Sequence, residues 1–179
     1  MEKEITMPVG VVVERKKIDH IWADWTWKPV AVLCDPPEIP AWHVMKNEGA
    51  ITHFHAATVG LNFHRKLVEA YKVNLAGEAP LLWVILQEVD YSESSSEEWP
   101  YKVHLVTASP YDAQDLLDSG DEIVEAVAMP EAIVSRLVAF VKAHPEEVPF
   151  KKRKRDRLDL EELKFSKQPI FARADRNVD

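Results

Sequence analysis

Residues 81–87 read LLWVILQ, a run with no polar side chain before Gln87. A strand that carries apolar side chains on both of its faces is covered on both, because an uncovered face would leave apolar area in water. The run therefore predicts a central strand of a sheet, with further structure packed on each side.

Other segments with strand periodicity lie on both sides of this run. The valine-rich first segment and the long segment with alternating histidines are the clearest, and Asp35 is followed by two prolines that end the second strand because proline cannot supply ladder donors. An alternating apolar pattern after residue 100 indicates an antiparallel partner for the central run. The predicted strands span residues 5–14, 28–34, 53–64, 81–87, 101–105 and 121–128.

Two helices are marked by their ends. Ser109 is a natural N-cap, Pro110 suits the first helical position, and Gly120 closes a helix over residues 110–119. A second helix begins near Pro130 and runs to about residue 143. Its apolar stripe, which should dock on the sheet, consists of Ile133, Val134, Leu137, Val138 and Val141.

The fold class that follows is α+β. We expect a mainly antiparallel sheet or open barrel of about six to seven strands, with two helices in the C-terminal half. Residues 65–67 should turn the chain, and residues 70–75 (AYKVNL) favour a strand over a short helix. Residues 91–99 (YSESSSEEW) predict a polar hairpin loop.

Charge divides the chain into two parts. Residues 151–179 hold 10 basic and 6 acidic side chains, which gives this segment a charge of +4. Residues 1–150 carry −12, and the two parts together give the net charge of −8. We expect a globular domain over residues 1–148 and a basic tail over 149–179 that is mobile or ordered by a partner. An acidic domain repels the phosphate backbone, so specific nucleic-acid binding is not expected.

The compartment indicated by the sequence is the cytoplasm. Cys34 is the only cysteine, so an internal disulfide and a cysteine-rich metal site are both excluded. The first residues are charged with mixed sign and predict no secretory signal, and no apolar run approaches the roughly 20 residues that span a bilayer.

Three histidines are the candidate metal ligands. In a regular strand, His53 and His55 project from one face together with Val59, Leu61 and Phe63, and His43 could lie nearby. Since no spacing fixes a third ligand, half-buried, hydrogen-bonded imidazoles are the alternative interpretation, and we predict no metal site.

Tryptophans and a basic run are the candidate partner-binding residues. Trp22, Trp25 and Trp27 lie close together in sequence, and at least one should pack inward while Trp22 and Trp25 remain to contact a partner. The basic run could bind an acidic partner through several charges at once. It consists of Lys151, Lys152, Arg153, Lys154 and Arg155.

One candidate anion site remains. Thr107 and Ser109 precede a helix whose first N–H groups could hold a phosphate or carboxylate, although an ordinary N-cap explains the same residues. The motifs of common nucleotide-binding, hydrolase and zinc-protease sites are missing, so no catalytic residue and no cofactor are predicted.

Four segments resemble a bacterial family of unknown function. They lie at residues 7–15 (MPVGVVVER), 27–33 (WKPVAVL), 107–120 (TASPYDAQDLLDSG) and 149–155 (PFKKRKR), and the similarity covers about residues 7–157. The genes of this family tend to lie beside those for molybdenum-dependent formate dehydrogenase and its maturation factors. Some members are labelled molybdopterin-guanine dinucleotide biosynthesis protein A.

The resemblance implies a role in formate dehydrogenase biogenesis and supplies no catalytic residue. Our leading hypothesis is a non-enzymatic accessory factor that holds a dehydrogenase subunit or a maturation factor through its tryptophan-containing sheet surface and its basic tail. The alternative is a protein that binds or transfers the molybdenum cofactor or a nucleotide, with the helix start at Ser109 as its anion site.

Overall fold

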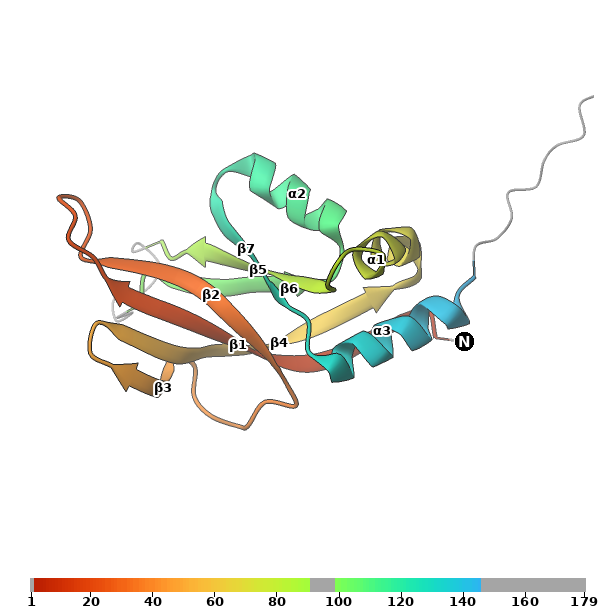
Figure 1. Ribbon diagram of the computed structural model, residues 1–179, viewed down its shortest axis with the longest axis horizontal. Helices are drawn as coiled ribbons and strands as arrows, with labels where there is room; N and C mark the ends of the chain where they lie inside the picture. The colour runs from red at the N-terminus through yellow and green to blue at the C-terminus, as the bar shows by residue number, and fades with distance from the viewer. Residues whose placement is uncertain (1, 91–98, 146–179) are drawn as a thin grey trace, which may run out of the picture. The chain divides into compact units, whose positions relative to one another are not determined.

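The computed structural model describes residues 2–90 and 99–145. In these ranges the chain forms seven strands, arranged in two antiparallel sheets, and three α-helices (Figure 1). The predicted α+β class and the predicted strand number are confirmed, and the strands of the described ranges form no closed barrel. None of the helices described is long and apolar enough to cross a membrane.

The first sheet has the strand order β2-β1-β4-β3. Its strands are β1 (Glu4–Lys17), β2 (Trp25–Cys34), β3 (His43–Glu48) and β4 (Ile51–His64). Three of them were predicted, and β2 begins earlier than expected because Trp25, Thr26 and Trp27 pair with the end of β1. β3 was not predicted, since all six of its side chains are exposed and show no apolar alternation.

The second sheet has the order β6-β5-β7. It consists of β5 (Leu81–Glu88), β6 (Tyr101–Thr107) and β7 (Glu122–Ala128). The central position predicted for the LLWVILQ run is confirmed, with β5 paired on both edges. The hairpin loop expected between β5 and β6 lies mostly outside the described residues.

The two sheets pack face to face around one hydrophobic core, in which β4 contacts β6 and β2 contacts β7. Alternate valines of β1 (Val9, Val11 and Val13) are fully buried between the sheets. Burying each such side chain contributes about 1.5–3 kcal/mol, so the alternation of β1 fixes which face meets the second sheet.

Helices α2 (Pro110–Ser119) and α3 (Glu131–Ala143) begin and end within a residue of the predictions. Ser109 caps α2, and Gly120 ends it in the left-handed conformation with φ of 75°. In α3 the buried residues are Ile133, Leu137 and Phe140. Val134 and Val141 of the predicted stripe are partly buried against the same core, whereas Phe140 was not part of the predicted stripe.

The prediction of a strand at residues 70–75 is wrong. The chain forms a short 3₁₀ turn, η1 (Arg65–Leu67), and then helix α1 (Val68–Leu75). Its buried residues are Val68, Ala70, Tyr71 and Asn74, and the spacings of three and four between them place all four on one side of a helix. Because β4 and β5 belong to different sheets, this connection crosses between layers and cannot be a simple hairpin.

Candidate partner-binding surface

The tip of the β1–β2 hairpin carries the most exposed apolar side chains of the described residues. Ile21 is 89% exposed and Trp22 is 87% exposed. The tip is closed by a hydrogen bond from the Ile18 N–H to the Asp24 carbonyl (2.9 Å), and the Trp22 N–H donates to Nδ1 of His20 (3.2 Å). The hairpin extends past the ends of the second sheet (Figure 1), so the tip is presented to solvent.

Below the tip, aromatic rings from three separate parts of the chain form a cluster that we call the tryptophan face. Phe54 of β4, which is 1% exposed, forms its floor. Trp99 lies 5.0 Å from Phe54 and stacks on Trp42 at 5.3 Å between ring centroids. Trp27 lies 5.7 Å from Trp42, both pack against the hydrophobic core, and all four tryptophans of the cluster are half-buried. The members are Trp25, Trp27, Trp42, Phe54, Trp99 and Tyr101.

Arg15 of β1 lies among these rings. Its guanidinium carbon is 4.3 Å from the centroid of Trp25, and it is also close to Phe54 (5.1 Å) and Trp27 (5.7 Å). Its Nε is buried without a hydrogen-bond partner, and no carboxylate of the described residues forms an ion pair with it. The cation–π contacts hold the guanidinium in a half-buried position without neutralising it.

Sequence reasoning missed the part that Arg15 plays here. The signal was present, because Arg15 continues the inward alternation of Val9, Val11 and Val13 and therefore points to the same side. Trp42 and Trp99 could not be assigned, since they join the cluster from irregular segments far apart in the sequence.

The three candidate metal ligands lie on two neighbouring strands without converging. His43 is paired with His55 across β3 and β4, whereas His53 Nε2 lies 3.0 Å from a carboxylate oxygen of Glu14. The described parts of the chain contain no group of three or more histidine, cysteine or carboxylate side chains placed to hold a metal.

The prediction that His53 and His55 share a face with Val59, Leu61 and Phe63 is wrong. Val11 pairs with Ala57 and Val12 pairs with His55, so Ala56 is an extra residue of β4. Such a β-bulge reverses the alternation of side chains. As a result the fully buried His55 lies on the opposite face, where its Nε2 is 3.3 Å from the hydroxyl of Thr58 and its Nδ1 has no partner.

The helix start predicted as an anion site is capped by the chain itself. The hydroxyl of Ser109 accepts from the Asp112 N–H (3.2 Å), and the hydroxyl of Thr107 accepts from the Ser109 N–H (3.1 Å). Ser109 is fully buried and Thr107 is 7% exposed. A cavity of about 520 Å³ opens beside Pro110, lined also by Val73 and Trp83.

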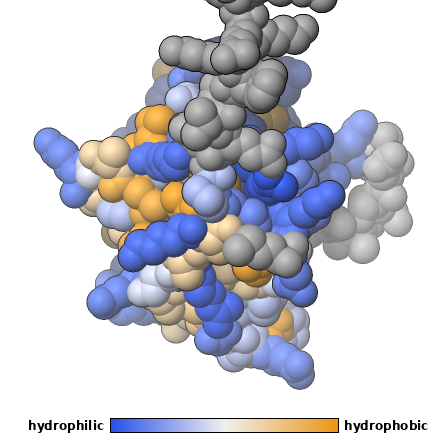
Figure 2. All heavy atoms as spheres, turned by 90° about the vertical axis from the view of Figure 1, so that its right-hand side faces the viewer, coloured by the Kyte–Doolittle hydropathy of each residue, from blue (hydrophilic) through white to orange (hydrophobic). Residues whose placement is uncertain are grey.

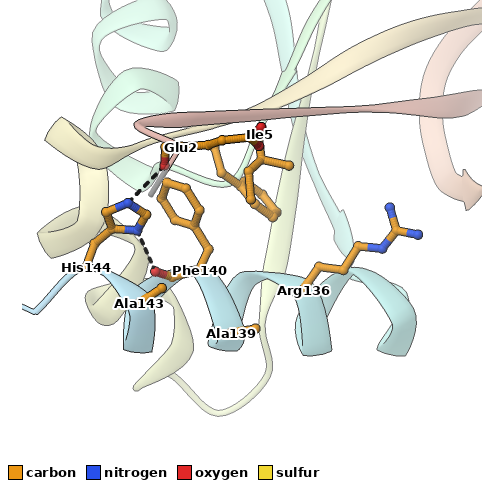
Figure 3. A pocket seen from close by; sticks show the side chains of 8 residues that line it. Glu2, Ile5, Arg136, Ala139, Phe140, Ala143 and His144 are labelled. Carbon is orange, nitrogen blue, oxygen red and sulfur yellow. Dashed lines mark hydrogen bonds between the residues drawn. The ribbon is translucent and has the colours of Figure 1, made fainter.

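An apolar pocket of about 400 Å³ lies between the start of β1 and α3, with Ile5, Phe63 and Phe140 among its lining residues. His144 closes one end of it (Figure 3): its Nδ1 lies 2.9 Å from the carbonyl of Phe140 and its Nε2 lies 3.0 Å from the carbonyl of Glu2. The imidazole thereby ties the beginning of β1 to the end of α3. Figure 2 shows the side of the molecule that lies at the right in Figure 1, and on this side hydrophobic residues form a patch surrounded by hydrophilic ones.

The fold and this surface define a class: a two-sheet α+β domain with an apolar hairpin tip and an aromatic, arginine-containing face. The chain belongs to the family described as "Protein of unknown function (DUF3305)", whose model matches residues 8–154. No curated protein and no solved structure matches the chain. The basic residues Lys151, Lys152, Arg153, Lys154 and Arg155 lie outside the described residues, so their role in binding a partner stays a prediction.

Proposed function

We propose that this protein is a non-enzymatic accessory factor that acts by protein–protein contact. Its partner is a molybdenum-dependent formate dehydrogenase subunit or a maturation factor of that enzyme, and it works in the cytoplasm. The resemblance of four sequence segments to a family encoded beside formate dehydrogenase genes supports this partner. The single cysteine supports the compartment.

The observation that carries the mode of action is the exposure of Ile21 and Trp22 at the hairpin tip (89% and 87%). Two large apolar side chains in water are costly, and burying each in a partner contributes about 1.5–3 kcal/mol. Tryptophan is enriched among residues that dominate binding energy, because it contributes much area for few rotatable bonds. The short loop that holds both residues limits the entropy lost on binding.

The proposal is tested by affinity capture from cells grown on formate, with the full-length tagged protein as bait. Replacing both Ile21 and Trp22 by serine should remove the captured dehydrogenase subunit or maturation factor. The matched control replaces Val73 and Leu117 by serine, since these two exposed side chains (51% and 53%) lie on α1 and α2, outside the first sheet and its aromatic cluster.

The expected outcome is loss of capture with the tip variant and retention with the helix variant, while deletion of the gene lowers formate oxidation. Recovery of no dehydrogenase subunit and no maturation factor by the unaltered protein, together with unchanged formate oxidation in the deletion strain, would refute the proposal.

A further inference from the structure

We infer that the tryptophan face is a binding site for an acidic peptide segment of a protein partner, in which a carboxylate pairs with Arg15 and a neighbouring apolar side chain packs on the rings. This inference deepens the proposed function by naming the chemistry of the partner, and it rests on the protein acting by contact. Its evidence comes from residues other than those of the hairpin tip.

The first argument is the state of Arg15. A guanidinium is a planar fork of N–H donors that matches a carboxylate in two parallel hydrogen bonds. Here the fork is held against Trp25 at 4.3 Å, and it has no carboxylate partner in the described ranges. Because the rings fix its position before binding, little side-chain entropy remains to be lost when an anion arrives.

The second argument is the arrangement of charge along β1. Arg15 pairs with Trp27 and Lys17 pairs with Trp25, so both cations point to the side of the tryptophan face. Lys16 lies between them in sequence and points to the other side of the sheet. The inward positions of this hairpin therefore carry two cations beside aromatic rings.

The third argument concerns the size of the ligand. The tryptophans of this face come from β2 and from segments next to β3 and β6, and they form a partly exposed surface above the buried floor of Phe54. A surface spread over so many elements is better covered by a peptide segment than by a single small anion. Arginine beside tryptophan and tyrosine is also the composition enriched at interface hot spots.

The acidic character of the rest of the chain makes this site selective. Residues 1–150 carry a net charge of −12, which repels an acidic partner at most orientations. Close approach then depends on the local cations Arg15 and Lys17, so changing either of them should matter more than changing a lysine elsewhere.

The test uses the purified full-length protein and a short, end-blocked synthetic peptide that carries glutamate and leucine among serines. Its counterpart, in which glutamine replaces glutamate, reports the contribution of the carboxylates. Binding is measured by calorimetry. Two-dimensional NMR of the indole N–H groups shows whether the resonances of Trp25, Trp27, Trp42 and Trp99 shift.

Two neighbouring lysines of one strand provide the matched comparison. Lys17→Gln should weaken the peptide about threefold, whereas Lys16→Gln, with the same charge change on the opposite face, should leave affinity unchanged. Arg15→Gln should weaken it about tenfold, and Arg15→Lys should recover only part of this loss because an ammonium lacks the planar fork. Lys17 is exposed at the end of β1, so its replacement cannot be confused with unfolding.

Equal weakening by Lys16→Gln and Lys17→Gln, or binding that shifts none of the four indole resonances, would overturn the inference and place the peptide elsewhere, for example on the basic run at residues 151–155. No binding of either peptide would overturn it as well. None of these outcomes would contradict capture of formate dehydrogenase through the hairpin tip. Conversely, a failure of the capture experiment would not contradict peptide binding at the tryptophan face.

Discussion

Gly10 of β1 lies directly beneath the imidazole of His55: a Cβ atom at residue 10 would stand 2.9 Å from His55 Nε2 and 2.8 Å from the Cβ of Pro36. The absent side chain therefore makes room for a histidine that is fully buried on the outer face of the first sheet. The β-bulge at Ala56 brings His55 to this position, and Pro36 of the β2–β3 connection approaches it from above.

Gly10→Ala should lower the free energy of unfolding by roughly 1–3 kcal/mol, since neither Pro36 nor a buried ring can move without disturbing its neighbours. Urea unfolding measures the change. Gly60→Ala is the control in the same sheet, because its Cβ would meet the methyl group of Thr6 at 3.1 Å and Asn62 at 3.9 Å, both of them exposed side chains that solvent leaves room to shift. Equal destabilisation by both substitutions would contradict the role of Gly10.

Asn74 should be among the most sensitive polar positions. Its amide group donates to the carbonyls of Leu81 and Ala108 (2.8 Å each), and its carbonyl accepts from the Leu81 N–H (2.9 Å). Asn74→Ala leaves three backbone groups of a nearly buried site without partners, and we expect a loss of about 2–3 kcal/mol in unfolding experiments.

Asn74→Asp distinguishes a hydrogen-bonding role from a packing role. The aspartate keeps the shape of the side chain and still accepts from Leu81, but it places a carboxylate against two carbonyl oxygens. The aspartate variant should therefore be at least as unstable as the alanine variant. If it were as stable as the unaltered protein, the three hydrogen bonds would not be the source of the effect.

Because of Tyr71, we expect the free energy of unfolding to decrease at alkaline pH. Burial raises the pKa of its hydroxyl above the ordinary value near 10, although the hydrogen bond from the His64 N–H acts in the other direction. Because the folded state holds this proton more tightly than the unfolded state, stability is complete below pH of about 10 and falls as the pH rises through the raised pKa.

Urea unfolding between neutral and strongly alkaline pH measures this effect. Tyr71→Phe should flatten the alkaline decline, at a cost of about 1 kcal/mol at neutral pH for the unpaired His64 N–H. Tyr111→Phe, at a side chain that is 55% exposed, should leave the decline unchanged. An identical alkaline decline in both variants would show that groups other than Tyr71 cause it.

The sequence predicted those elements whose causes are local. The β5 run has no polar face, and α2 has a serine cap, a proline at its first position and a glycine at its end, so neighbouring residues alone determine them. Helix α1 was mistaken for a strand because its six-residue apolar pattern suits both structures. Only the crossing from one sheet to the other decides between them.

The candidate surface was only partly predictable for a related reason. Trp22 and Trp25 could be named as candidates from the sequence, but one inserted residue, Ala56, places His53 and His55 on the face opposite to Val59, Leu61 and Phe63. The tryptophan face brings together residues of β2, β4 and β6 and of two irregular segments, and Arg15 of β1 lies against it. Such a meeting of distant residues depends on packing between sheets, which no local pattern encodes.

Substitution of Ser109 distinguishes the accessory-factor hypothesis from the anion-site hypothesis. Its hydroxyl already accepts the Asp112 N–H inside the protein, so Ser109→Ala should lower the free energy of unfolding by about 1 kcal/mol, as loss of an N-cap does. Ser119→Ala at the other end of α2 should have a smaller effect, since that hydroxyl is exposed and only donates to the Leu116 carbonyl (2.7 Å).

Calorimetry with GTP should detect no binding to either variant or to the unaltered protein. Submillimolar GTP binding that Ser109→Ala weakens without loss of stability would instead favour the anion-site hypothesis, because a hydroxyl that serves only as a cap affects stability first.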